Sequence, residues 1–112
     1  MNVCVIIGKV LSKPKIKKSD EEKGEYQILL ETYRPFKMSD GSSKKDIFPI
    51  VLWKGLADEV KSNVQVGDIV AIKGRMESEC RKIGDNDEFM SSIIAEKMTF
   101  ILSKESASQI TF

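Results

Sequence analysis

The stretch of residues 46–75, DIFPIVLWKGLADEVKSNVQVGDIVAIKGR, constrains the fold of this chain more than any other segment. An apolar run ends at Trp53, and a short amphipathic segment follows from Leu56 to Val64. A Val-Gly-Asp turn then leads into a second alternating segment that closes on Arg75. A strand, one short helix, a turn and a strand are typical of the middle of a small Greek-key barrel. The pattern therefore predicts a barrel with the helix at one end.

Alternation with a period of two indicates five strands in all. In the third, Phe48, Ile50 and Leu52 are expected to face the core, and Trp53 the opposite side, because successive side chains of a strand alternate. Tyr26 and Phe100 are also expected in the core. The predicted strands cover residues 3–11, 25–34, 46–53, 68–77 and 89–102, with a helix at 55–63 between the third and fourth. The expected class is all-β, and this element order matches the five-stranded OB-fold.

At 112 residues the chain is long enough for one domain and too short for two. Residues 1–102 are predicted to form the barrel. Residues 103–112, SKESASQITF, show no convincing period and are predicted to be a short flexible tail. A signal peptide and a long apolar span are not evident, so we expect a cytoplasmic protein with no membrane association.

The charge and the residue inventory argue against catalysis and metal binding. The net charge is +1, but residues 1–54 carry 11 basic and 7 acidic side chains, whereas residues 55–112 carry 7 and 10. A basic half suits a polyanion, although such charges usually only solvate a surface. The chain has no histidine, and Cys4 and Cys80 lack metal-ligand spacing, so neither a metal nor another cofactor is expected. With no phosphate-binding glycine loop either, the chain is not expected to be an enzyme.

Three segments, taken in order, resemble the family of bacterial single-stranded DNA-binding proteins. The opening VIIGKVLSKPKI is similar to the family's start, with Gly8, Lys9, Val10 and Pro14 in matching places. IVLWKGLADEV resembles the exit of the third strand and the start of the helix, and VGDIVAIKGR resembles the fourth strand. The resemblance covers nearly all of residues 2–102. It implies sequence-independent binding of single-stranded DNA in replication, recombination, repair or DNA uptake, by a nucleoid-associated homotetramer or dimer.

The sequence also departs from the family's pattern. Phe36 and Trp53 fall at two of the places where the family carries base-stacking aromatics, but Ile47 and Arg81 fill two others. The family's long linker and acidic tail are not matched, since Glu105 is the only acid among the last ten residues. The chain therefore looks like a short form, and recruitment of other proteins through a tail is not expected.

Binding of single-stranded DNA without sequence readout needs rings that stack on bases and cations that neutralise phosphates. Trp53 is the first stacking candidate, and the alternative is a Trp half-buried against the helix. Phe36 follows Arg34 and Pro35 at a strand end, beside a lysine-rich loop. The further candidates are two rings, Tyr33 and Phe89, and the cations Arg34, Lys37, Lys73, Arg75 and Arg81. Arg81 could replace a lost ring by stacking its guanidinium group.

Two other functions remain open from the sequence. One is an OB-fold RNA binder or primosome-like accessory subunit with reduced DNA affinity. The other is an OB-fold assembly protein whose partner is another protein, which the fewer aromatics and the near-neutral charge favour. Strand one offers a surface for self-association, because residues 3–7 are apolar and one small barrel has a limited core.

Overall fold

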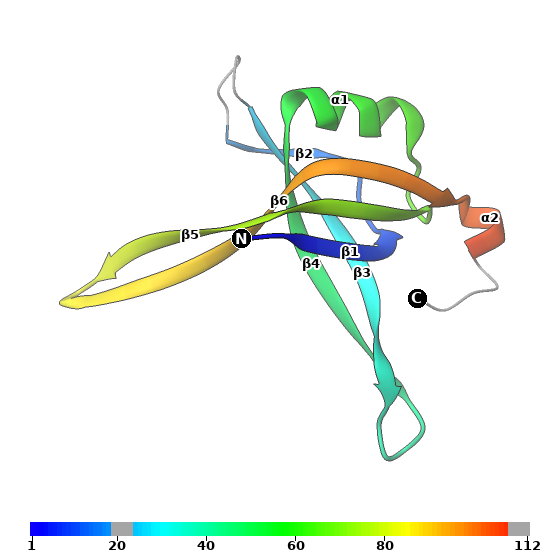
Figure 1. Cartoon of the computed structure of the whole chain (residues 1–112), viewed down its shortest axis with the longest axis horizontal. Helices are drawn as coiled ribbons and strands as arrows, with labels where there is room; N and C mark the ends of the chain where they lie inside the picture. The colour runs from blue at the N-terminus through cyan, green and yellow to red at the C-terminus, as the bar shows by residue number, and fades with distance from the viewer. Residues whose placement is uncertain (19–23, 108–112) are drawn as a thin grey trace.

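A computed structural model describes residues 1–18 and 24–107 of the chain, and shows six strands and two helices (Figure 1). In chain order they are β1 (Cys4–Val10), β2 (Lys15–Lys18), β3 (Glu25–Lys37), β4 (Ser43–Trp53), α1 (Lys54–Asn63), β5 (Ile69–Ile83), β6 (Asn86–Leu102) and α2 (Lys104–Ala107).

The strands form one closed sheet. Its order is β1-β5-β6-β4-β3-β2, and an additional pairing of β1 with β3 closes the barrel. The β4–β6 pairing is parallel, with Ile50 opposite Ile93, and the other pairings are antiparallel. A closed Greek-key barrel with a helix between its third and fourth barrel strands is an OB-fold, which confirms the predicted class.

The strand count differs from the prediction, because the segment after β1 forms a separate strand. β1 ends at Val10, and the next residues bind β3 through single contacts: the Leu11 amide donates to the Leu29 carbonyl at 2.8 Å, and the Leu29 amide donates to Ser12 Oγ at 3.0 Å. After Pro14 the chain pairs with β3 again, as β2. Proline lacks an amide hydrogen, so the ladder is interrupted there.

Two glycines let strands approach closely where the barrel closes. A Cβ on Gly8 would lie 2.5 Å from the Glu31 carbonyl oxygen, at the crossing of β1 and β3. A Cβ on Gly74 would lie 1.9 Å from the Ile94 carbonyl oxygen, beside a register shift between β5 and β6. Only glycine fits these backbone contacts without displacing a strand.

The core lies inside the barrel and under α1. The side chains of Ile28, Leu30, Ile50 and Leu52 are fully buried. Helix α1 adds Ala57 and Val60 to the same cluster, and Phe48 and Tyr26 pack against it while partly exposed. Burial of a large aliphatic side chain contributes about 1.5–3 kcal/mol each, so these residues supply much of the drive to fold.

Two hairpins extend beyond the barrel. The β3–β4 hairpin and the β5–β6 hairpin project in different directions (Figure 1). β3 and β5 end at Lys37 and Ile83, later than predicted, and β4 and β6 begin at Ser43 and Asn86, earlier than predicted. Apolar alternation reports burial, and these extensions are solvent-exposed, so the sequence pattern stops before the strands do.

The residues after β6 include a short helix, whereas the sequence predicted a loose tail from residue 103. In α2, the Lys104 amide donates to Asp68 Oδ1 at 2.8 Å. Asp68 is buried and also accepts from the Gln65 amide, at 2.9 Å. Its carboxylate thus attaches the start of α2 to the turn before β5. The rest of the predicted tail, residues 108–112, lies outside the described residues.

Candidate nucleic-acid interface

The outer face of β3 and β4 carries Trp53. Trp53 is 41% exposed, at the last position of β4 before α1 begins, and pairs with Glu25 of β3. Leu52 and Ile50 point the other way and are fully buried, so the predicted register of this strand is confirmed. Trp53 is therefore a half-exposed ring on a rigid strand rather than a core residue.

The same face continues along both strands toward the hairpin. Ile47, six residues before Trp53, is 53% exposed on this side. Val51 shares the face but is buried, because Gln27 on β3 and Ile94 on β6 flank it. Pro49 on the same face is exposed as well, so the exposed stripe from Ile47 to Trp53 is interrupted only at Val51.

Tyr33 lies at the far end of this face, where the hairpin leaves the barrel. It is opposite Lys45, whose Nζ is 5.5 Å from the centre of the Tyr33 ring. The same ammonium group is 4.0 Å from Glu31 Oε1. Tyr33 and Trp53 lie on one face, and the eight residue-to-residue steps along β4 from Lys45 to Trp53 span about 26 Å at roughly 3.3 Å each. Lys45 precedes the strand predicted over residues 46–53, but in the structure it belongs to β4 and contacts a ring.

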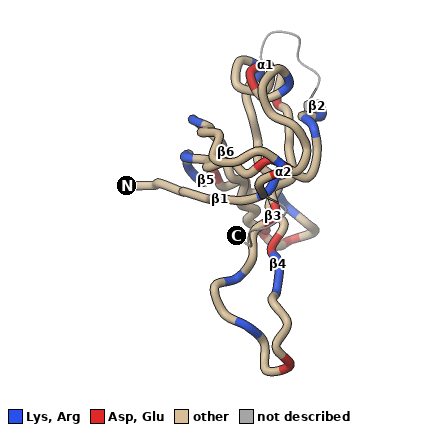
Figure 2. Tube along the Cα trace, turned by 90° about the vertical axis from the view of Figure 1, so that its right-hand side faces the viewer, with Lys and Arg blue, Asp and Glu red and all other residues tan. Residues whose placement is uncertain are grey.

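Phe36 and Lys37 lie on the hairpin itself. Phe36 is 58% exposed, next to the last pair of the hairpin, Lys37 with Ser43. A register shift between Tyr33 and Lys37 separates Phe36 from the regular ladder. Figure 2 shows basic residues along both strands of this hairpin.

Arg34 is engaged in an ion pair within the protein. Its Nε lies 3.1 Å from Asp46 Oδ2, and its Nη2 lies 3.0 Å from Asp46 Oδ1. Hydrogen bonding by Arg34, and then its charge, hold the pKa of the Asp46 carboxyl below its usual range, and the same pairing raises the pKa of Arg34. Both groups are ionised at neutral pH, so much of the Arg34 charge is already compensated.

Arg75 is also paired with acids. Its Nη2 lies 2.6 Å from Glu77 Oε2, and its Nη1 lies 3.5 Å from Glu96 Oε2. Lys73 is exposed on a different part of the barrel, between Val5 of β1 and Lys97 of β6. Neither of these two predicted cations lies on the strands that carry Trp53.

Arg81 and Phe89 lie on the β5–β6 hairpin and point to opposite sides of it. Phe89 is 73% exposed and pairs with Cys80, whereas Arg81 pairs with Glu88. Arg81 therefore has an acid beside it and no ring, and the structure does not bring it together with Trp53 or Tyr33.

One residue near Trp53 was not a predicted contact. Lys15 of β2 is exposed and pairs with Gln27, which in turn pairs with Val51, so Lys15 lies on the outer face of these strands. The signal in the sequence was the cluster of lysines before Asp20, but only the pairing of β2 with β3 shows where one of them lies.

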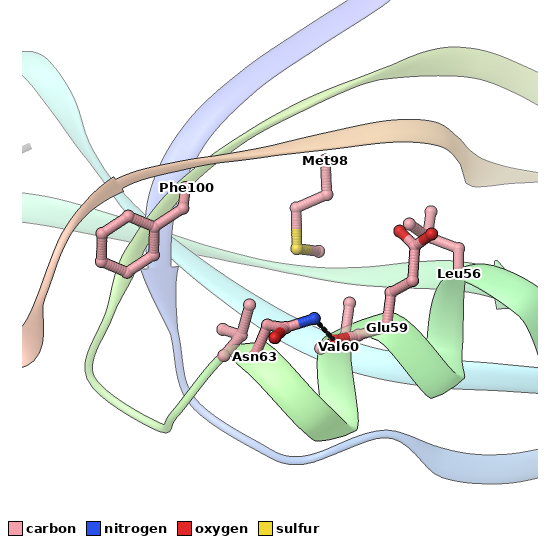
Figure 3. Close-up of a pocket in the computed structure, with 7 residues that line it drawn as sticks. Leu56, Glu59, Val60, Asn63, Met98 and Phe100 are labelled. Atoms are coloured by element: carbon pink, nitrogen blue, oxygen red, sulfur yellow. Dashed lines mark hydrogen bonds between the residues drawn. The ribbon is translucent and has the colours of Figure 1, made fainter.

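A groove on another side of the barrel separates α1 from β6 (Figure 3). Phe100, which the sequence assigned to the core, lines this groove and is 50% exposed. The core assignment was wrong because Phe100 pairs with Val70 near the end of β6, where the groove opens to solvent. The lining residues are Leu56, Glu59, Val60, Asn63, Val64, Met98 and Phe100.

Two searches of the described residues gave negative results. Within residues 1–18 and 24–107, no group of three or more Cys, Asp or Glu side chains is arranged to hold a metal ion. In the same part of the chain, no helix has the length and apolar character needed to cross a membrane.

The closed Greek-key barrel with one helix between β4 and β5 defines the class: this is an OB-fold protein. The sequence model of the single-strand binding protein family matches residues 1–101. The chain therefore belongs to the single-strand binding protein family.

Individual relatives are distant but cover most of the chain. Single-stranded DNA-binding protein 3 of Listeria innocua is 24% identical over 106 residues, which are 94% of this chain and 66% of that protein. Single-stranded DNA-binding protein 1 of Clostridium acetobutylicum is 21% identical over 109 residues, 96% of this chain and 99% of that protein. The chain thus spans about two thirds of the Listeria relative and nearly all of the clostridial one.

Solved structures support the fold. A complex of a Plasmodium falciparum SSB with single-stranded DNA superimposes with a TM-score of 0.70 at 20% identity, over 90% of this chain and 95% of that one. A small single-stranded DNA-binding protein from Streptomyces coelicolor superimposes with a TM-score of 0.64 at 16% identity, over 89% of this chain and 94% of that one.

Proposed function

We propose that this protein binds single-stranded DNA without reading its sequence, along the outer face of β3 and β4. The observation that carries the proposal is the half-exposed Trp53 on a strand whose neighbouring residues, Leu52 and Ile50, are fully buried. Such a ring is held in place by the core behind it and can stack on any base, since every base has a π-face. Membership of the single-strand binding protein family supports the same proposal.

The proposed path runs from Trp53 to Tyr33 and then to Phe36 on the hairpin. Lys15, Lys37 and Lys45 would contact phosphates along it. Arg34 and Arg75 would contribute less than the sequence predicted, because each already binds carboxylates. The remaining predicted contacts, Lys73, Arg81 and Phe89, lie away from this path.

The biological setting we propose is exposed single-stranded DNA in the cytoplasm, at the nucleoid, during replication, recombination, repair or DNA uptake. We further propose that the protein acts as a homo-oligomer, a tetramer or a dimer. Val3, Val5 and Ile7 of the N-terminal segment and β1 are 55%, 64% and 44% exposed, an apolar stripe that a second copy would cover.

Fluorescence titration tests the DNA-binding proposal. Trp53 is the only tryptophan, so its emission should be quenched when oligo-dT is added and a base stacks on the ring. Parallel titration with oligo-rU separates a DNA binder from an RNA binder. Unchanged emission, together with no binding of oligo-dT by an independent method, would refute the proposal.

The ion-paired arginines favour a second candidate, an accessory or assembly protein with reduced DNA affinity. Measurement of affinity at several salt concentrations distinguishes the two. If the protein contacts Z phosphates, log K falls against log salt with a slope of about −0.7Z. We expect a small negative slope. A slope of zero would favour the second candidate, an accessory or assembly protein whose partner is another protein.

A further inference from the structure

The groove between α1 and β6 has two apolar walls (Figure 3). Leu56, Val60 and Val64 form the wall along α1 and its C-terminal end, because residues four apart lie on one stripe of a helix. Met98 and Phe100 form the wall on β6, because residues two apart share a face of a strand. The fold therefore leaves two apolar surfaces facing each other across an open groove.

The size of the groove suits one large apolar side chain. The groove has a volume of about 140 Å³. An apolar cavity of about 150 Å³ holds one benzene ring. Val60 is 3% exposed and Phe100 is 50% exposed, so the groove reaches from the core to the solvent. A phenyl ring that enters the groove would contact Val60 and cover the exposed part of Phe100.

The backbone of β6 beside the groove has an open edge. β6 pairs with β4 only at Ile93 and Ile94, because β4 ends at Trp53 and the chain continues as α1. Among the described residues, β5 is the only strand that pairs with residues 97–102 of β6. An open edge can pair with the backbone of an extended peptide. Backbone pairing next to a pocket for one side chain is the combination by which sheets bind peptides.

The charge at the groove favours a protein over a nucleic acid. Glu59 is the only charged residue of the lining, and it is exposed. Within residues 1–18 and 24–107, no Lys or Arg forms an ion pair with Glu59. An uncompensated carboxylate repels phosphates and attracts Lys or Arg. The groove therefore suits an occupant that is both apolar and basic.

We propose that the groove binds an extended segment of another protein. One apolar side chain of the size of phenylalanine enters the groove, a Lys or Arg of the segment faces Glu59, and the backbone of the segment pairs with residues 97–101 of β6. The groove is on a different side of the barrel from Trp53, so an occupied groove leaves the outer face of β3 and β4 open for DNA. The site itself does not depend on the proposed binding of DNA.

NMR titration with a designed peptide tests the site. The probe is the end-capped peptide KTFTK, whose lysines lie on the same side of an extended chain as its phenylalanine. The peptide should shift the amide signals of residues 59–63 and 97–101 in ¹⁵N-labelled protein. The peptide KTATK lacks the ring and should bind more weakly by about tenfold or more. Equal binding of the two peptides, or no shift of these signals at millimolar peptide, would overturn the proposal.

A charge reversal with a matched control tests the role of Glu59. Glu59→Lys should weaken binding of KTFTK by about fivefold, as expected for a solvent-exposed ion pair, and should strengthen binding of ETFTE. The control, Asp58→Lys, makes the same change at the adjacent acid of α1, which does not line the groove, and should change neither affinity. Equal losses in the two variants would show that only the overall charge matters, and the proposed recognition by Glu59 would be wrong.

Other occupants of the groove give different results. The affinity for KTFTK should be the same with and without oligo-dT, and competition between them would place DNA in the groove. If Phe100→Ser lowers the sedimenting mass while the protein stays folded, the groove is an interface between copies. Nuclear Overhauser contacts between residues 108–112 and Phe100 without peptide would show that the chain's own end fills the groove. Each of these three results would overturn the proposal.

Discussion

Trp53 and Leu52 are neighbours in the chain with opposite surroundings, 41% exposed and fully buried respectively. Alternation along β4 is sufficient to separate them, since successive side chains point to opposite faces. Substitutions at these two positions therefore test DNA binding and fold stability separately.

Trp53→Ala should weaken binding of oligo-dT by about 1–3 kcal/mol, the usual loss for one stacking contact. Leu52→Ala should instead lower the free energy of unfolding by about 2–5 kcal/mol through a core cavity, with binding of the folded fraction unchanged. Fluorescence anisotropy of labelled oligo-dT measures the affinity for DNA, and urea denaturation measures the free energy of unfolding. Normal binding by a Trp53→Ala protein that melts early would make Trp53 a structural residue.

The pair of Arg34 and Asp46 makes a second prediction at this scale. Asp46→Asn should free the guanidinium group for a phosphate, tighten DNA binding and steepen the salt slope by about 0.7, the value for one further phosphate contact. Titration at two or more salt concentrations measures both changes. Unchanged affinity and slope would show that Arg34 does not reach the DNA.

The same pair responds to pH in a defined direction. Arg34 lowers the pKa of the Asp46 carboxyl, so the ion pair stabilises the fold at any pH above 3.8, the ordinary pKa of the group. This contribution to stability is lost as the pH falls through the lowered pKa. Binding measured between pH 6 and pH 8 should therefore show no titration of this pair. NMR titration of the Asp46 carboxyl carbon checks the direction of the shift.

At the scale of elements, the crossings of strands depend on glycines. Gly74→Ala would place a methyl group against the Ile94 carbonyl and should destabilise the protein by about 1–3 kcal/mol or more. Gly55→Ala is the matched control, because nothing lies within 4 Å of its added Cβ and it sits in α1, where alanine is preferred by about 0.8–1.0 kcal/mol. Equal stability of the two variants in urea would contradict the close approach at Gly74.

Element boundaries were harder to predict than element types. The helix and five strands were predicted in the correct order, but β2 was missed and both hairpins were predicted too short. Burial creates the alternating pattern. β2 has only four residues, of which Lys15 and Ile16 are exposed, and the outer ends of the hairpins have no buried side to reveal them.

At the scale of the whole molecule, the apolar stripe of residues 3–7 predicts self-association. Sedimentation at micromolar concentration should show at least a dimer. Val5→Asp should shift the distribution toward the monomer, because a charge would be buried without a partner at the interface. Lys73→Asp, an adjacent and already charged position, serves as control. A native protein that sediments as a clean monomer would contradict the prediction.

The sequence by itself determined the local features of this protein. Hydrophobic alternation placed Trp53 opposite Ile50 and Leu52, and the order of strands and helix indicated the OB-fold. These features follow from repeats of two residues along a single segment, which neighbouring side chains encode directly.

Only the tertiary structure decided which predicted site residues share a surface. Arg34 and Arg75 are neutralised by acids on paired strands or beside them, and Phe89 and Arg81 lie on the β5–β6 hairpin, away from Trp53. Those relations depend on the register between strands that are distant in the chain, and a shift of one residue would reverse every face. Charge and aromatic content can be counted from a sequence, but their placement on one surface is a property of the closed barrel.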